Sequence, residues 1–139
     1  MKKLPLALML FMLLTSCMEE QVPATYFAGT IWSAYETGGI FGADNKLTGI
    51  YINTHVLTLN ATSFSHIIYR KEAAVNGIGY ADKDTTYMEG VYKIRYPNLT
   101  LNYGNVERAG IVEWGTINLE IDDTQRTLQF LKNTAAGAY

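Results

Sequence analysis

Apolar and polar positions alternate with a period of two through most of the chain after residue 29. β-Branched and aromatic residues occupy many of the alternating positions, which is typical of strands with one buried face. In the segment 49–59, for example, the odd-numbered positions from Tyr51 to Leu59 share one face. The pattern predicts strands over residues 30–36, 49–59, 63–71, 86–95, 99–103, 111–121 and 126–132.

Strands that follow one another through tight turns form an antiparallel meander, and a long meander protects its edges best by closing on itself. No helix of respectable length is visible, which excludes folds built from strand–helix–strand units. The glycine-rich segment 37–47 is expected to be a loop. Residues 72–85 are either a helical turn, which Asn76-Gly77 breaks, or the irregular end of a strand. We therefore predict an all-β domain of seven or eight strands that closes as a barrel or packs as a sandwich.

One tryptophan breaks the alternation. In the segment 111–121, strict alternation puts Trp114 on the face opposite to Ile117. Gly115 lies between them and could host a β-bulge, which would bring Val112 and Trp114 onto the core face with Ile117. We therefore expect Trp114 to be buried.

The start of the chain differs in character from the rest. Lys2 and Lys3 precede the uncharged apolar run 4–14, and Thr15, Ser16 and Cys17 follow it. A basic start, an apolar centre and small residues are the layout of a secretory signal peptide. The apolar run is shorter than the roughly 20 residues that a membrane-spanning helix needs. Residues 1–16 are therefore predicted to be a cleaved signal peptide.

The four residues from Leu14 to Cys17 resemble a bacterial lipobox. In that family of signals the cysteine thiol is acylated, and cleavage then leaves the cysteine as the first residue. Cys17 is the single cysteine of the chain, so it cannot form an intramolecular disulfide. Acyl chains such as palmitate contribute about 0.8 kcal/mol per buried methylene, so two or three chains anchor a protein stably. The resemblance implies that the protein is lipid-anchored through Cys17 to the bacterial cell envelope.

The residues after Cys17 give two interpretations. Glu19 and Glu20 resemble the acidic surface-export signals of lipoproteins in the Bacteroides group, which would place the protein on the outer membrane and expose it at the cell surface. An acidic solvated tether explains them equally well. The predicted organisation is a signal peptide over 1–16, a flexible tether over 17–28, a β-domain over 29–132 and a frayed tail over 133–139.

The order of features in the β-domain is similar to that of small lipocalin-like lipoproteins of the Bacteroides type. The similarity lies in three segments, which are Gly29–Trp32, Gly90–Tyr92 and residues 127–132. It implies an up-and-down barrel whose lumen takes a small lipophilic ligand. In lipocalins a basic residue late in the barrel packs over the tryptophan, and Arg126 is the nearest candidate here. Candidate ligand-binding residues are Trp32, Tyr92 and Trp114.

Charge and the histidines exclude several other functions. The net charge is −2, and no cluster of Lys or Arg follows residue 3, which argues against nucleic acid as a partner. The two histidines, His55 and His66, lie on neighbouring strands of one predicted hairpin, where pairing about the turn 60–62 could bring them near. A metal site needs further ligands with suitable geometry. We therefore expect both histidines on a sheet surface, and predict no metal and no cofactor.

Catalytic arrangements are also missing from the sequence. Ser65 and His66 are adjacent, so their side chains point to opposite faces of a strand and cannot pair. The carboxylates fall mostly in turns, where solvation explains them. We predict a protein without enzymatic activity.

Two functions remain open. The first is an envelope lipoprotein whose barrel binds a small apolar or amphipathic molecule. The second is a structural or protein-interaction module with a solid barrel core, in which some of the 10 tyrosines contact another envelope protein. The tripeptide Asp84-Thr85-Thr86 also resembles the short O-glycosylation acceptor of periplasmic proteins in the Bacteroides group.

Overall fold

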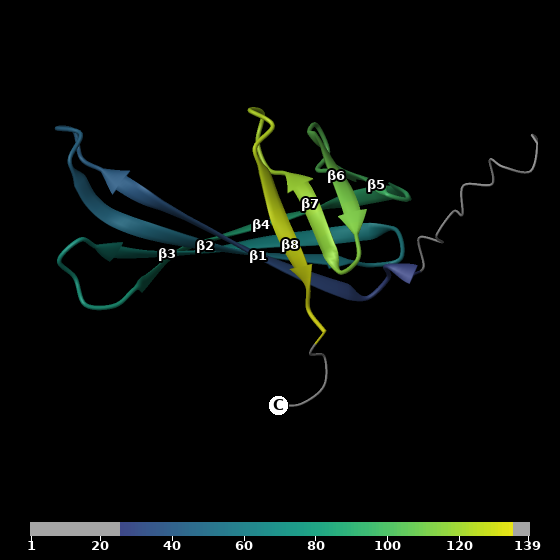
Figure 1. The fold of residues 1–139 in the computed structure, drawn as a ribbon, viewed down its shortest axis with the longest axis horizontal. Helices are drawn as coiled ribbons and strands as arrows, with labels where there is room; N and C mark the ends of the chain where they lie inside the picture. The colour runs from purple at the N-terminus through teal and green to yellow at the C-terminus, as the bar shows by residue number, and fades with distance from the viewer. Residues whose placement is uncertain (1–25, 135–139) are drawn as a thin grey trace, which may run out of the picture.

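The computed structural model describes residues 26–134, and these residues form one closed barrel of eight antiparallel strands (Figure 1). Each strand pairs with the next, and the last strand pairs with the first, so the prediction of an all-β meander is confirmed and the barrel replaces the sandwich. The strands are β1 Thr30–Phe41, β2 Leu47–Leu59, β3 Ser63–Ala74, β4 Ala81–Arg95, β5 Asn98–Asn102, β6 Glu107–Glu113, β7 Thr116–Glu120 and β8 Thr127–Lys132.

The first four strands are much longer than the last four. They have 12 to 15 residues each, whereas β5 to β8 have 5 to 7. The surplus length forms an extension of β1–β4 that projects beyond the barrel, on the left in Figure 1. The predicted loop at 37–47 is therefore wrong for residues 37–41, which belong to β1, and of the two interpretations for 72–85 the strand end is the one that holds, since β3 runs to Ala74 and β4 begins at Ala81. Residues 37–41 are extended because they pair with β2. The ring of Tyr51 lies over Gly38, where the lack of a side chain leaves space for the ring.

The up-and-down order gives the barrel two different ends. At one end, which we call the entry end, the chain enters through residues 26–29, and the turns 60–62, 96–97 and 114–115 lie there. At the other end, the far end, lie the turns 42–46, 75–80, 103–106 and 121–126. β8 also finishes at the entry end, so both ends of the described chain leave the barrel on the same side.

Alternating side chains of every strand fill the barrel. Burying such a side chain contributes about 1.5–3 kcal/mol relative to leaving it exposed. Residues 26–28, which the sequence assigns to the tether, form a turn against the barrel because Phe27 inserts its ring into this core. The buried apolar residues are Phe27, Trp32, Ala34, Leu57, Leu59, Phe64, Tyr92, Leu99, Leu101, Val112, Ile117, Leu119 and Phe130.

The expectation that Trp114 is buried is wrong, since its side chain is 96% exposed. The predicted long strand 111–121 is a hairpin in which Trp114 and Gly115 form the turn between β6 and β7. Gly115 has a φ of 74°, a left-handed conformation that reverses the chain without the steric cost of a side chain. Val112 and Ile117 do face the core, as expected, but they face each other across this hairpin. The tryptophan at the tip projects outward.

One glycine gives a direct test of the packing. A β-carbon added at Gly90 would lie 1.9 Å from the backbone oxygen of Asn102 and 2.9 Å from the ring of Phe64. We expect Gly90→Ala to lower the free energy of unfolding by about 3 kcal/mol, at the upper end of overpacking costs. Gly110→Ala is the control, because its β-carbon would lie 3.2 Å from the nearest atom. Urea unfolding of both variants measures the difference, and equal losses would contradict the register at Gly90.

Candidate functional site

A cleft of about 380 Å³ opens at the entry end of the barrel. Buried Phe27, Trp32 and Val112 contribute to its walls from the core side. Its other lining residues are Tyr26, Tyr96, Glu113, Trp114, Gly115 and Lys132. The structure thus brings two of the three predicted ligand-binding residues, Trp32 and Trp114, into one cleft although they are far apart in the sequence.

Trp32 is held in a fixed orientation at this cleft. Its indole Nε1 donates a hydrogen bond of 2.9 Å to Thr30 Oγ1, and the Thr30 hydroxyl donates one of 2.6 Å to the backbone oxygen of Phe27. The ammonium of Lys132 lies 5.9 Å from the centre of the Trp32 ring and 5.8 Å from that of Tyr26. The cleft therefore combines apolar walls with one cation that two aromatic faces attract.

The basic residue over Trp32 is Lys132, so the expectation for Arg126 is wrong. Arg126 belongs to the turn between β7 and β8, which lies at the far end of the barrel. Lys132 is the last residue of β8 and pairs in register with Trp32 of β1, so barrel closure brings the lysine to the ring. The direction of β8 and its register with β1 together decide which basic residue lies at the Trp32 ring.

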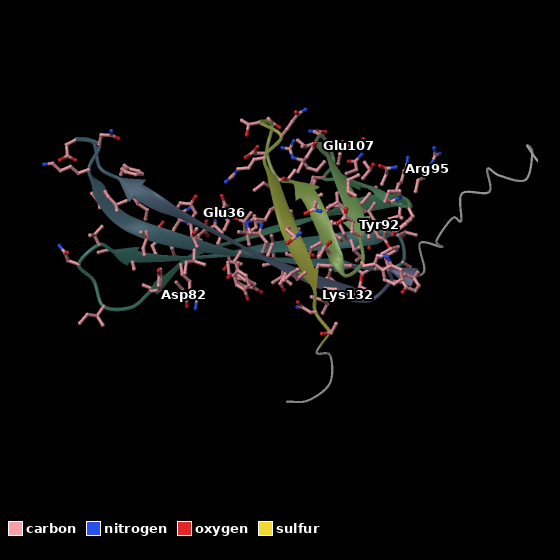
Figure 2. The ribbon with its side chains drawn as sticks, viewed as in Figure 1. Glu36, Asp82, Tyr92, Arg95, Glu107 and Lys132 are labelled. Carbon is pink, nitrogen blue, oxygen red and sulfur yellow. The ribbon has the colours of Figure 1, made fainter. Side chains whose placement is uncertain are left out.

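Tyr92, the third predicted residue, does not line the cleft. Its ring is buried in the core, and its hydroxyl donates a hydrogen bond of 2.5 Å to the backbone oxygen of Asn60 (Figure 2). Burial raises the pKa of this hydroxyl, which therefore stays protonated at neutral pH. Tyr92 thus holds the turn between β2 and β3 in place at the entry end.

The two histidines lie inside the barrel, and the expectation that they sit on a sheet surface is wrong. Each is 3% exposed, and His55 Nδ1 lies 3.1 Å from His66 Nε2. His66 Nδ1 lies 3.0 Å from the hydroxyl of Tyr103, a residue directly after β5. His55 shares its face with Leu57 and Leu59, so the alternation already pointed to a buried position.

The network continues from the histidines to the far end of the barrel. His55 Nε2 lies 3.5 Å from a carboxylate oxygen of Glu36, and Asn53 Nδ2 donates a hydrogen bond of 3.2 Å to the same oxygen. The other oxygen of Glu36 pairs with the guanidinium of Arg126. Arg126 Nε also lies 2.8 Å from Asp122, so the chain of polar contacts ends at the exposed turn 121–126.

The geometry allows one consistent set of donors along this network. The Tyr103 hydroxyl donates to His66 Nδ1, His66 Nε2–H donates to His55 Nδ1, and His55 Nε2–H points to Glu36. In this arrangement both imidazoles are neutral and the carboxylate is charged. Among the described residues, His55 Nε2 and Asn53 Oδ1 are buried without a hydrogen-bond partner of normal length, so the network is satisfied only in part.

The pKa shifts agree with those charge states. Burial and, to a smaller extent, the neighbouring His55 together lower the pKa of His66 to about 4. Burial also lowers the pKa of His55, against the opposing effect of Glu36. Burial raises the pKa of Glu36, but the hydrogen bonds from Asn53 and Arg126 outweigh it, so that the net shift is downward. Burial raises the pKa of Tyr103 to about 12.

Within residues 26–134, no group of three or more His, Cys, Asp and Glu side chains is arranged to hold a metal ion. The same residues contain no helix of the length and apolar character that a bilayer crossing requires. Cys17, the predicted signal peptide 1–16, residues 17–25 of the predicted tether and residues 135–139 of the predicted tail lie outside the described residues.

Comparison of the chain with protein-family models, with curated proteins and with solved structures finds no match.

The buried histidines predict a specific loss of stability in acid. The pKa of His66 is about 4 in the folded protein, against an ordinary value of 6.5. The unfolded chain therefore binds more protons between these values, and stability falls as the pH is lowered from 6.5 toward 4. The loss amounts to about 3 kcal/mol for His66 alone. Urea unfolding across this pH range measures it.

The control for this prediction is His66→Gln, which keeps hydrogen-bonding groups but does not titrate. The variant is expected to be less stable than the natural protein at pH 7 but to show a flatter pH dependence between 6.5 and 4. Parallel pH profiles for the two proteins would contradict the assignment of a buried neutral imidazole to His66.

Proposed function

We propose that this protein is a lipid-anchored lipoprotein of the bacterial cell envelope, similar to small lipocalin-like lipoproteins, whose barrel binds a small amphipathic ligand without catalysing a reaction. The observation that carries the proposal is the entry-end cleft, which unites Trp32 and Trp114. Its volume of about 380 Å³ lies within the range of about 300–1,000 Å³ that is usual for small-molecule sites. The proposed ligand site thus lies at the end of the barrel. The interior of the barrel is packed with side chains.

The lining of the cleft indicates the chemistry of the ligand. Phe27, Trp32 and Val112 offer an apolar surface that suits an acyl chain or a ring system. The ammonium of Lys132 stands above the Trp32 ring, where it can pair with an anionic group of the same molecule. A single-chain lipid or another small amphiphile with a negative head fits this combination.

The proposed anchor agrees with the position of the cleft. Cys17 precedes Tyr26 by nine residues, and Tyr26 lines the cleft. Acylation of Cys17 would place the cleft next to the membrane in which the acyl chains lie. An outer-membrane location, with the barrel on either side of that membrane, follows from the lipobox resemblance and the acidic residues Glu19 and Glu20.

A second candidate function is a structural or protein-interaction module. Two observations favour it: the centre of the barrel is filled by side chains with little or no exposure, and tyrosines stand on the outer face of the extension. Tyr35, Tyr69 and Tyr87 are all exposed there, and Tyr35 and Tyr69 flank Thr54 on neighbouring strands. Such a surface could contact another envelope protein.

Ligand binding can be tested by native mass spectrometry of the full chain isolated from the envelope of its bacterial host. We expect a discrete bound mass in the natural protein and about tenfold weaker retention in Trp114→Ala, a loss of about 1.4 kcal/mol. Trp114 is exposed, so this variant leaves the core intact. Tyr35→Ala removes another exposed aromatic side chain away from the cleft and should retain the ligand. Natural protein that carries no small molecule would overturn this proposal in favour of the interaction module.

Lipidation can be tested separately by mass spectrometry of the chain from a bacterial membrane fraction. The expected product begins at Cys17 and carries the additional mass of acyl groups, because a thioether forms only on that thiol. Cys17→Ser is expected to lack the acyl mass. An unmodified natural chain, or acyl mass on the Cys17→Ser chain, would contradict the lipid anchor.

A further inference from the structure

We infer that the entry end of the barrel docks on the bilayer surface, with Trp114 inserted at the level of the lipid headgroups. The inference rests on the proposed lipid anchor and extends it from the tether to the folded domain. The partner is a phospholipid bilayer with anionic lipids, and the contact surface is formed by Tyr26, Tyr96, Trp114, Arg95 and Lys132.

The first observation is the exposure of aromatic side chains at this end. Trp114 is 96% exposed and Tyr26 is 67% exposed, and Tyr96 is also exposed. Tryptophan and tyrosine concentrate at membrane–water interfaces, because one part of the side chain is apolar and the other forms hydrogen bonds. A tryptophan at the tip of a two-residue turn contributes nothing to the core, so its presence there indicates a contact outside the domain.

The second observation is that the apolar surface continues on both sides of Trp114. One side is the entry-end cleft. On the other side, a hollow of about 600 Å³ is lined by Tyr96, Pro97, Ile111 and Thr116, among others. Tyr96, Val112, Glu113 and Trp114 line both hollows. Trp114 therefore stands between two hollows on one surface, rather than as an isolated exposed residue.

The third observation is the distribution of charge. Lys132 and Arg95 end their strands at the entry end (Figure 2). Glu113 is an acidic side chain beside Trp114 at the same end. The aspartates in the turns and strand starts of the far end pair with cations there: Asp44 with Lys46, Asp82 with Lys71, Asp122 with Arg126 and Asp123 with Arg108. A basic residue close to an anionic membrane surface contributes about 1 kcal/mol of attraction. Lys132 and Arg95 therefore supply the attraction between the entry end and an anionic bilayer.

The fourth observation is the length of the tether. The nine residues from Cys17 to Tyr26 span at most about 30 Å even when fully extended. β1 alone, with 12 residues, runs about 40 Å from the entry end toward the tip of the extension. An acyl chain on Cys17 thus keeps the entry end close to the membrane. The tether is too short to let the tip of the extension insert into the same bilayer.

Docking has a consequence for the proposed ligand. The cleft that contains Trp32 and Trp114 opens at the surface that would face the lipid. An amphipathic molecule could then move between the bilayer and the cleft without crossing bulk water. The geometry points to a lipid of the same membrane as the ligand class.

Trp114 fluorescence tests the docking directly. The full chain, isolated with its anchor, is placed on phosphatidylethanolamine–phosphatidylglycerol vesicles with or without brominated acyl chains. The chain has 2 tryptophans, and Trp32 is buried, so the difference between the natural protein and Trp114→Phe reports Trp114. We expect a blue shift of this difference emission on vesicles, and quenching by about half on brominated vesicles, as for a residue at the interface.

The matched control is Ile78→Trp in the Trp114→Phe background. Position 78 lies in the turn between β3 and β4 at the far end and is fully exposed. Its emission is expected to stay unshifted and unquenched on the same vesicles. Trp114 emission that stays as in water, or equal quenching at positions 78 and 114, would overturn docking through the entry end.

Sedimentation with the vesicles separates this inference from the anchor. If the natural chain carries no acyl mass, the lipid anchor is wrong, and the Trp114 signal still decides whether the barrel end binds lipid. If the natural chain sediments but Trp114 stays in water, the anchor stands and docking is overturned.

Discussion

Closure of the barrel depends on a short seam between β1 and β8, and the entry end is built around it. In register, only Trp32 with Lys132 and Ser33 with Leu131 pair across this seam. Neighbouring hydrogen bonds reinforce it: Lys132 N donates to the backbone oxygen of Gly115, and Asn133 N donates to that of Ile31. The seam therefore positions three things at once, namely the ring of Trp32, the cation above it and the hairpin that carries Trp114.

The seam is short because the two halves of the chain differ in strand length. β5 to β8 can cover only the first part of the long β1–β4 sheet, so the barrel closes near the entry end and the remainder projects as the extension. At the boundary between these two regions lies the polar network of His55, His66 and Glu36. Arg126, which Asp122 holds within the turn between β7 and β8, pairs with Glu36 there. An ion pair thus connects the two halves of the chain where the pairing of β8 with β1 ends.

The two ends of the barrel consequently differ in character. The entry end is aromatic and lies next to the start of the described chain, whereas the turns of the far end carry paired acidic and basic side chains. A protein held by an acyl group before its first strand would present these ends differently to the membrane and to the surrounding solution. The cleft, the exposed tryptophan and the proposed anchor would then form one surface, and the extension would point away from it.

Strand positions and the meander followed from the sequence, because alternation with a period of two and turn residues are local properties. The shared face of Leu57 and Leu59, which both lie in the core, followed in the same way. Alternation assigns residues to a face, but only closure decides which face is inside. For that reason the contact of Lys132 with Trp32 and the pairing of Glu36 with Arg126 became visible only in the tertiary structure. Residues 37–41 are a strand and Trp114 lies at a hairpin tip. Cross-strand register determines where each strand ends, and no local pattern in the sequence encodes that register.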